Sequence, residues 1–194
     1  MFQKIFYINL DHRTDRLKSI ESVVSGHDAQ RIPGFYTPEV KGLGCATSHI
    51  RCLKEAIDKG YENCLILEDD FVPVSRPLME ASIDMFLDSG IDWDVVMLAG
   101  NIWKKKSEGW IDRVYDGQTT SGYAVNKKYY KDLLEVFMEA ETGLFHGKPY
   151  HLCAIDQVWK KLQKSGKWYA FNPLVGRQMD GYSDIEGKEV SYGC

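Results

Sequence analysis

The sequence lacks an excess of basic residues. Its 24 lysine and arginine residues are outnumbered by 28 aspartate and glutamate residues, and the formal net charge is −4 at pH 7. It also has no basic tail and no basic stripe. Proteins that bind nucleic acid neutralise phosphates with clustered lysine and arginine, so we do not expect nucleic acid to be the main partner.

Long apolar segments are missing as well. No stretch approaches the roughly 20 apolar residues that cross a bilayer, so the sequence predicts no transmembrane segment. The first ten residues, MFQKIFYINL, contain one lysine and a short apolar run interrupted by polar side chains. They lack the long apolar stretch and the small-residue cleavage site of a signal peptide. These absences favour a cytoplasmic protein.

The cysteines do not form a recognisable framework. There are five, an odd number, and no two of them stand in a CxxC pair. This pattern favours reduced thiols over a set of disulfides or a zinc site of the CxxC type. The five residues are Cys45, Cys52, Cys64, Cys153 and Cys194.

Strands and helices alternate along the 194 residues, without repeats or low-complexity segments. Short apolar runs predict buried strands, and apolar residues at a spacing of three to four predict helices. Near-continuous apolar strands that alternate with helices predict an α/β protein with a mostly parallel central sheet and helices on both faces. The expected strands span 4–10, 63–69, 94–100, 122–126 and 167–172, and the expected helices span 14–24, 47–60, 77–90, 127–140 and 154–166.

The ends of these elements carry further expectations. Thr14 or Asp15 is the expected N-cap of the first helix, and Thr47 or Ser48 that of the second. Gly60 can adopt the left-handed conformation that ends a helix. We expect a mobile loop over residues 101–120, which are polar and poorly periodic, and an irregular tail over 173–194.

Three consecutive acids, Glu68, Asp69 and Asp70, follow the strand predicted over 63–69. Ligands bind at the carboxyl ends of the strands in such sheets. If the backbone stays extended, Glu68 and Asp70 point to one side and Asp69 to the other. Two carboxylates on one side suit Mg²⁺ or Mn²⁺, whose open positions phosphate oxygens can fill. The alternative is a solvated acidic turn.

Two arginines, Arg13 and Arg16, come shortly after the first strand. The forked donors of arginine match phosphate oxygens, so both side chains could meet the same diphosphate. Alternatively, the two arginines lie on a solvated helix face and bind nothing. In GLGCATSH (42–49), glycines precede a helix and could receive an anion at its N-terminus, or form only a tight turn. His49 in this segment is either structural or catalytic.

Asp156, at the start of the helix predicted over 154–166, also allows two interpretations. A carboxylate in the first turn stabilises a helix through its dipole, which contributes less than about 1 kcal/mol. It could also act as a general base. On the residues alone, the dipole interpretation is preferred.

Several segments, read together and in order, resemble glycosyltransferase family 25, which includes lipopolysaccharide β-galactosyltransferases and procollagen galactosyltransferases. The resemblance covers most of the chain, and no single segment is specific. The segments are FYINLDHRTDRL, GLGCATSHI, LILEDDF, SGYAV, IDQVW and PLVGRQMDGYSDIEG. The resemblance implies a GT-A type fold, a UDP-hexose donor such as UDP-galactose, and a divalent cation, typically Mn²⁺. It also implies one glycosyltransferase domain over 1–194, with a nucleotide-binding half over about 1–100 and an acceptor-side half over about 101–194.

The resemblance also assigns roles to residues. It makes Asp70, Glu68 and Gln178 the metal ligands, with ribose as an alternative partner for Glu68. It implies that a small residue on the strand with Ser121 and Gly122 permits close approach to the sugar. The residues it places at the donor are Asn9, Leu10, Arg13, Arg16, Asp69, Ser121, Gly122 and Asp184, and Ser183 belongs to the same terminal motif.

Sugar transfer requires a base that takes the proton of the acceptor hydroxyl. Asp156 is the predicted base because it lies in a matching motif, and His49 and Asp184 are the substitutes. The expected reaction moves galactose or glucose, with inversion, to a saccharide or to a hydroxylated protein or lipid-linked acceptor. Two other functions use the same features: a nucleotide-sugar or carbohydrate-binding module that has lost catalysis, and a metal-dependent phosphohydrolase.

Overall fold

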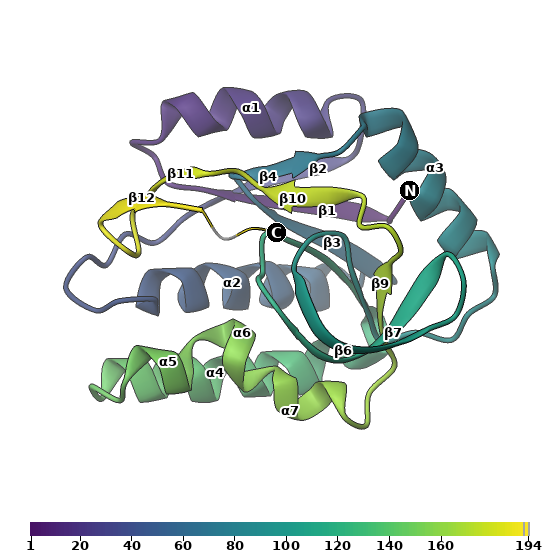
Figure 1. Cartoon of the computed structure of the whole chain (residues 1–194). Coiled ribbons are helices and arrows are strands. Elements are labelled where there is room, and N and C mark those ends of the chain that lie inside the picture. The colour runs from purple at the N-terminus through teal and green to yellow at the C-terminus, as the bar shows by residue number, and fades with distance from the viewer. Residues whose placement is uncertain (192, 194) are drawn as a thin grey trace.

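The computed structural model describes residues 1–191 and 193 of the chain. In this part of the chain, eight strands form one large sheet that joins the N-terminal and C-terminal segments (Figure 1). Across the sheet the order is β2 (Ala29–Pro33), β1 (Lys4–Asn9), β3 (Asn63–Glu68), β8 (Gly122–Asn126), β5 (Val95–Met97), β9 (Trp168–Phe171), β7 (Ile111–Gln118) and β6 (Asn101–Ser107).

The sheet is mixed. Strand β1 is parallel to β2 and β3, and β5 is parallel to β9. Between these two parallel blocks lies β8, which is antiparallel to both of its neighbours, β3 and β5. Strand β7 is antiparallel to β6 and β9. The predicted α/β class is confirmed, and the two antiparallel strands make the sheet mixed.

Helices cover both faces of this sheet, as predicted (Figure 1). Helices α1 (Thr14–Val24) and α3 (Arg76–Asp88) pack on one face. The opposite face carries α2 (Leu43–Lys59) and α4 (Tyr130–Phe145), which the turn η1 (Lys127–Tyr129) precedes. The short helices on this side are α5 (Tyr150–Cys153), α6 (Ile155–Val158) and α7 (Lys160–Gln163).

Strand β3 shows why a continuous apolar run forms the centre of this sheet. Successive side chains of a strand point to opposite faces. Cys64 and Ile66 therefore lie in the core beneath α2 and α4, while Leu65 and Leu67 lie in the core beneath α1 and α3. All four are at most 1% exposed. Burial on both faces ends at Glu68, so the first polar side chain lies at the carboxyl edge of the sheet.

Both predicted helix N-caps are wrong. Helix α1 begins at Thr14 with Arg13 as its N-cap, and no side chain caps it. Helix α2 begins at Leu43, and its N-cap, Gly42, has a positive φ of 78°. The helix therefore starts earlier than expected. A Cβ on Gly44 would lie 2.0 Å from the carbonyl oxygen of Phe35, so the glycine allows the first turn to pack directly on the preceding loop. The predicted end at Gly60 is confirmed, with φ 69°.

The prediction of a mobile loop over residues 101–120 is also wrong. These residues form the antiparallel pair β6 and β7 at the edge of the main sheet. Strand β7 is ordered by its pairing with β9, in which Ile111 lies opposite Phe171, a residue about sixty positions further along the chain. Strand β6 is exposed and carries consecutive lysines, a pattern that protects an edge strand from further pairing.

The C-terminal third contains more breaks and more strands than predicted. The single helix expected over 154–166 is divided into α6 and α7 at Trp159, whose indole N–H donates to the Gly117 carbonyl (2.9 Å). The tail expected to be irregular contains three short strands. Strand β10 (Gly176–Gln178) pairs with β4 (Phe71–Pro73), and β11 (Gly181–Ser183) pairs with β12 (Lys188–Val190) as a hairpin.

Four cysteines, Cys45, Cys52, Cys64 and Cys153, are free, as predicted, and Cys194 lies outside the described residues. Within residues 1–191 and 193, no helix combines the length and the apolar character that crossing a membrane requires.

Candidate functional site

Two of the three acids at the end of β3, Asp69 and Asp70, share one guanidinium group. Strand β3 ends at Glu68, and Asp69 and Asp70 form a turn. The expected alternation is therefore wrong, because the turn brings Asp69 and Asp70 to the same side. Arg16 Nη1 lies 3.1 Å from a carboxylate oxygen of each. Arg16, on the first turn of α1, is the positive charge that compensates these acids.

Asp70 is the most constrained of the three acids. It is buried, and its Oδ2 accepts hydrogen bonds from Arg16 and from Gln178 Nε2, each at 3.1 Å. Its Oδ1 is buried and has no hydrogen-bond partner. Burial, and next the nearby charge of Glu68, raise the pKa of Asp70 to about 7. A buried carboxylate oxygen without a partner is costly, and a bound cation would remove that cost.

Gln178 reaches Asp70 because β10 pairs with β4. In that pairing Gln178 lies opposite Phe71, and the Met179 amide donates to the Asp70 carbonyl (2.8 Å). The side-chain amide of Gln178 donates to Asp70 in this arrangement, so Gln178 orients the carboxylate. Its predicted role as a metal ligand stays a prediction.

Glu68 points away from Arg16 toward α2. Its Oε1 accepts from Thr120 Oγ1 (2.6 Å) and lies 3.2 Å from His49 Nε2. The other ring nitrogen of His49 lies 2.8 Å from the Tyr123 hydroxyl. Burial alone would raise the pKa of Glu68. The hydrogen bond and charge of His49, together with the hydrogen bond from Thr120, outweigh burial and lower this pKa. Glu68 is therefore ionised at neutral pH.

The end of β1 and the start of α1 hold the acids in place and attach the C-terminal hairpin. Asn9 Nδ2 donates to Asp69 Oδ2 (2.7 Å). Arg13 Nη1 donates to Asp184 Oδ2 (2.8 Å), and Arg16 Nη2 donates to the Tyr182 carbonyl (2.8 Å). Burial would raise the pKa of Asp184, but His12 and Arg13 outweigh it and lower the pKa. The two arginines thus connect α1 to the β11–β12 hairpin.

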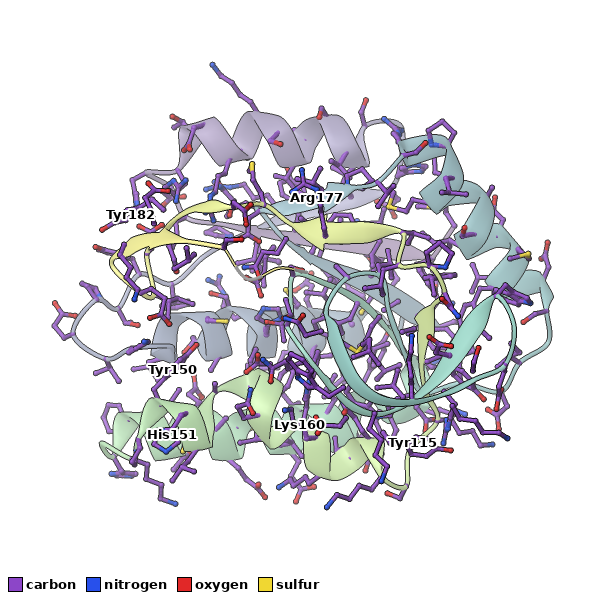
Figure 2. All side chains as sticks on the ribbon, in the orientation of Figure 1. Tyr115, Tyr150, His151, Lys160, Arg177 and Tyr182 are labelled. Atoms are coloured by element: carbon purple, nitrogen blue, oxygen red, sulfur yellow. The ribbon has the colours of Figure 1, made fainter. Side chains whose placement is uncertain are left out.

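Two adjoining pockets open beside these residues. The first, the acidic pocket, brings together eight of the predicted site residues: Leu10, Arg16, His49, Glu68, Asp69, Asp70, Gln178 and Asp184. The second, the Asp156 pocket, is lined by Asp156, Thr119, Tyr150 and His151. Both pockets share Cys45, Glu68 and Gln178, so they meet at these side chains. Figure 2 shows Tyr150 beside the N-terminal end of α2, below the hairpin that carries Tyr182.

Asp156 is half-buried at the start of α6. Its Oδ2 accepts from the Thr119 amide (3.2 Å), and its Oδ1 accepts from Gln157 Nε2 (3.3 Å). Burial raises the pKa of Asp156, although these two hydrogen bonds oppose the shift. A carboxylate with a raised pKa is a stronger base when it is ionised. Helix α6 has only four residues, which makes stabilisation of its dipole a weak reason for an acid here.

Asn9, Arg13, Ser121 and Gly122 do not line either pocket in the described part of the chain. Ser121 is fully buried, and its Oγ has no hydrogen-bond partner. A Cβ on Gly122 would lie 2.6 Å from Phe71 Cδ2, so packing against Phe71 explains the glycine. The predicted close approach of Gly122 to a sugar stays a prediction.

We expect Gly122→Ala to lower the free energy of unfolding by about 1–3 kcal/mol, because the added methyl overpacks against Phe71. Urea denaturation measures this loss. In the Phe71→Leu background the same substitution should cost clearly less. An unchanged stability together with a raised KM for the sugar donor would favour the sugar-contact role instead.

Thr120, Tyr123 and Cys45 are site residues that the sequence reasoning missed. Thr120 fell in the segment predicted to be a loop, and Tyr123 was assigned only to a strand. Cys45 and His49 are four residues apart on one helix, a spacing that places both side chains on the same face. This spacing is the signal from which the sequence could have predicted that the two side chains lie together.

Residues 38–90 match the family model for glycosyltransferase family 25 (LPS biosynthesis protein). This segment includes Cys45, His49 and the three acids. The predicted resemblance is therefore confirmed over this segment, which supplies α2, β3 and about half of the residues that line the acidic pocket.

Two solved structures share the fold at low sequence identity. One is A197 from STIV, with a TM-score of 0.54 and 14% identity, over 98% of this chain and 93% of that chain. The other is a glycosyltransferase involved in the glycosylation of the major capsid of PBCV-1, with a TM-score of 0.54 and 14% identity, over 94% of this chain and 95% of that chain. These similarities support the fold of this chain.

Proposed function

We propose that this chain is a divalent-cation-dependent glycosyltransferase that moves a hexose, galactose or glucose, from a UDP-sugar to an acceptor hydroxyl. The acceptor is a saccharide or a hydroxylated protein or lipid-linked group. The observation that carries this proposal is the buried Asp70 oxygen without a partner, beside Glu68 and inside the family 25 segment. The protein acts as a single domain in the cytoplasm.

The residues present fit a hard divalent cation, Mn²⁺ or Mg²⁺. Glu68 and Asp70 both line the acidic pocket and supply the oxygen ligands that these ions prefer. When bound, the cation neutralises negative charge that develops on the leaving diphosphate. Arg16 and Lys41 line the same pocket and would bind phosphate oxygens from the protein side. Asp69, held by Asn9 and Arg16, keeps Arg16 oriented.

The transfer itself is a single displacement with inversion. The acceptor oxygen forms a bond to the anomeric carbon, the bond from that carbon to the phosphate oxygen breaks, and its electron pair leaves with UDP. Asp156 takes the proton of the acceptor hydroxyl as the bond forms. The Asp156 pocket adjoins the acidic pocket at Glu68, so an acceptor there would face a donor bound beside the acids.

Calorimetric titration with UDP-galactose and UDP-glucose, with MnCl₂ or with EDTA, tests the donor and the cation. We expect binding of at least one UDP-sugar that weakens at least tenfold in EDTA. UDP release is then measured with a panel of saccharide acceptors. The proposal would be refuted if neither UDP-galactose nor UDP-glucose bound. Full-rate release of free sugar without any acceptor would indicate a phosphohydrolase, and binding without turnover over the whole panel would indicate a binding module.

We expect Asp156→Asn to lower kcat for transfer by roughly 10²-fold, because the amide cannot accept the acceptor proton. The dissociation constant for the UDP-sugar should stay within about twofold, since Asp156 lies in the other pocket. Steady-state kinetics and donor titration measure the two quantities, and Asp132→Asn on α4 is a control remote from both pockets. An unchanged kcat would exclude Asp156 as the base and leave His49 and Asp184.

A further inference from the structure

Three side chains at the junction of the two pockets have the composition of a transition-metal site. Cys45 and His49 lie one helical turn apart on α2, and Glu68 ends β3. Their ligand atoms, the Cys45 sulfur, a His49 ring nitrogen and a Glu68 carboxylate oxygen, all lie within 4.8 Å of one another. The i, i+4 spacing places both helix residues on the face that meets β3.

The imidazole is oriented before any ion binds. The Tyr123 hydroxyl holds His49 Nδ1 (2.8 Å), and the Tyr123 ring stacks on the imidazole with centroids 5.7 Å apart. Phe137 contacts the imidazole ring edge-on, with centroids 6.2 Å apart. These contacts direct Nε2 toward Glu68, and a partner on the second nitrogen is what metal-binding histidines have.

The donor atoms differ from those of the proposed Mn²⁺ site. A thiolate and an imidazole favour Zn²⁺ over Mn²⁺ or Mg²⁺, which prefer oxygen. Ligand atoms on a tetrahedral zinc lie roughly 3.5 Å apart. His49 Nε2 and Glu68 Oε1 are already 3.2 Å apart, and no pair of the three ligand atoms is separated by more than 4.8 Å, so only a small adjustment of the side chains is needed. Three protein ligands leave a fourth position, and here both pockets lead to it because Cys45 and Glu68 line both.

We infer that Cys45, His49 and Glu68 form an open, three-ligand Zn²⁺ site at the junction of the two pockets. Binding forms zinc–sulfur, zinc–nitrogen and zinc–oxygen bonds, and the Cys45 thiol releases its proton to solvent. Because Glu68 is shared with the proposed Mn²⁺ pair, zinc at this site competes for Glu68 and inhibits transfer. The zinc site itself does not depend on the proposed function.

The test uses the whole chain, freed of metal with EDTA and dialysed. Zn²⁺ is titrated by calorimetry, and Co²⁺ is titrated by absorbance as a spectroscopic substitute. We expect one equivalent of each ion and a thiolate-to-cobalt charge-transfer band. Cys45→Ser should abolish the band and weaken zinc binding at least tenfold, while Cys153→Ser, which changes a free cysteine on α5, should change neither.

Tyr123→Phe supplies a test that leaves all three ligands in place. Loss of a partner to the ligating histidine typically weakens metal binding by about 10–100-fold, so we expect weaker zinc binding with the charge-transfer band retained. Circular dichroism verifies that each variant is folded. Absence of zinc binding, or zinc binding and a cobalt band unchanged in Cys45→Ser, would overturn the inference.

Discussion

Asp70→Asn is expected to lower kcat for sugar transfer by roughly 10³-fold, the upper range for removing one preorganised electrostatic group. The substitution keeps the shape of the side chain but removes a carboxylate that lines the acidic pocket together with Glu68. Without that charge, the cation and the diphosphate lose their anchor. Asp88→Asn, at an exposed aspartate that ends α3, is the matched control and should retain full activity.

Stability measurements separate this catalytic loss from a loss of fold. The folded pKa of Asp70 is about 7, above the roughly 3.9 of an unfolded aspartate. Between these values the folded protein binds more protons than the unfolded chain, so Asp70 makes the free energy of unfolding fall as pH rises from about 4 to about 7. Asparagine removes this dependence.

Urea denaturation in EDTA at pH 5 and pH 8 measures the difference. The wild-type protein should lose more stability between these pH values than Asp70→Asn does. Retention of more than a tenth of the wild-type kcat, or the same pH dependence in both proteins, would contradict the role assigned to Asp70.

Arg16→Ala is expected to lower the free energy of unfolding by about 3–5 kcal/mol at pH 8, because it leaves buried carboxylates without their cation. The Arg16 side chain is 11% exposed, and those of Asp69 and Asp70 are 11% and 9% exposed. The substitution also removes the hydrogen bond to the Tyr182 carbonyl, which helps to hold the C-terminal hairpin.

A divalent cation should restore part of the stability that Arg16→Ala loses. Glu68, Asp69 and Asp70 lack a compensating charge in Arg16→Ala, so MnCl₂ should raise its melting temperature more than that of the wild-type protein. Lys18→Ala, which removes a positive charge from the same helix, is the control and should behave like the wild type in both measurements. Equal stabilisation of Arg16→Ala and wild type by MnCl₂ would show that Arg16 does not stand in for a cation.

The local pattern of the sequence was sufficient for the elements that form the core. Continuous apolar runs marked β1, β3 and β8, and helical periodicity marked α1 and α3. It also placed the acids at the carboxyl end of β3, because burial on both faces of a strand ends where the first charge appears. Ordered short motifs predicted a resemblance to family 25, and the family model matches it over residues 38–90.

The tertiary structure alone decides which distant residues contact one another. Arg16 reaches Asp69 across 53 residues, and Arg13 reaches Asp184 across 171. Strand β8 inserts between β3 and β5, which brings Tyr123 to His49 and Thr120 to Glu68. Periodicity reports which side of an element is buried, but it does not specify which distant element covers that side. The partners of the acids, and the site where the two pockets meet, therefore arise only when the sheet is assembled.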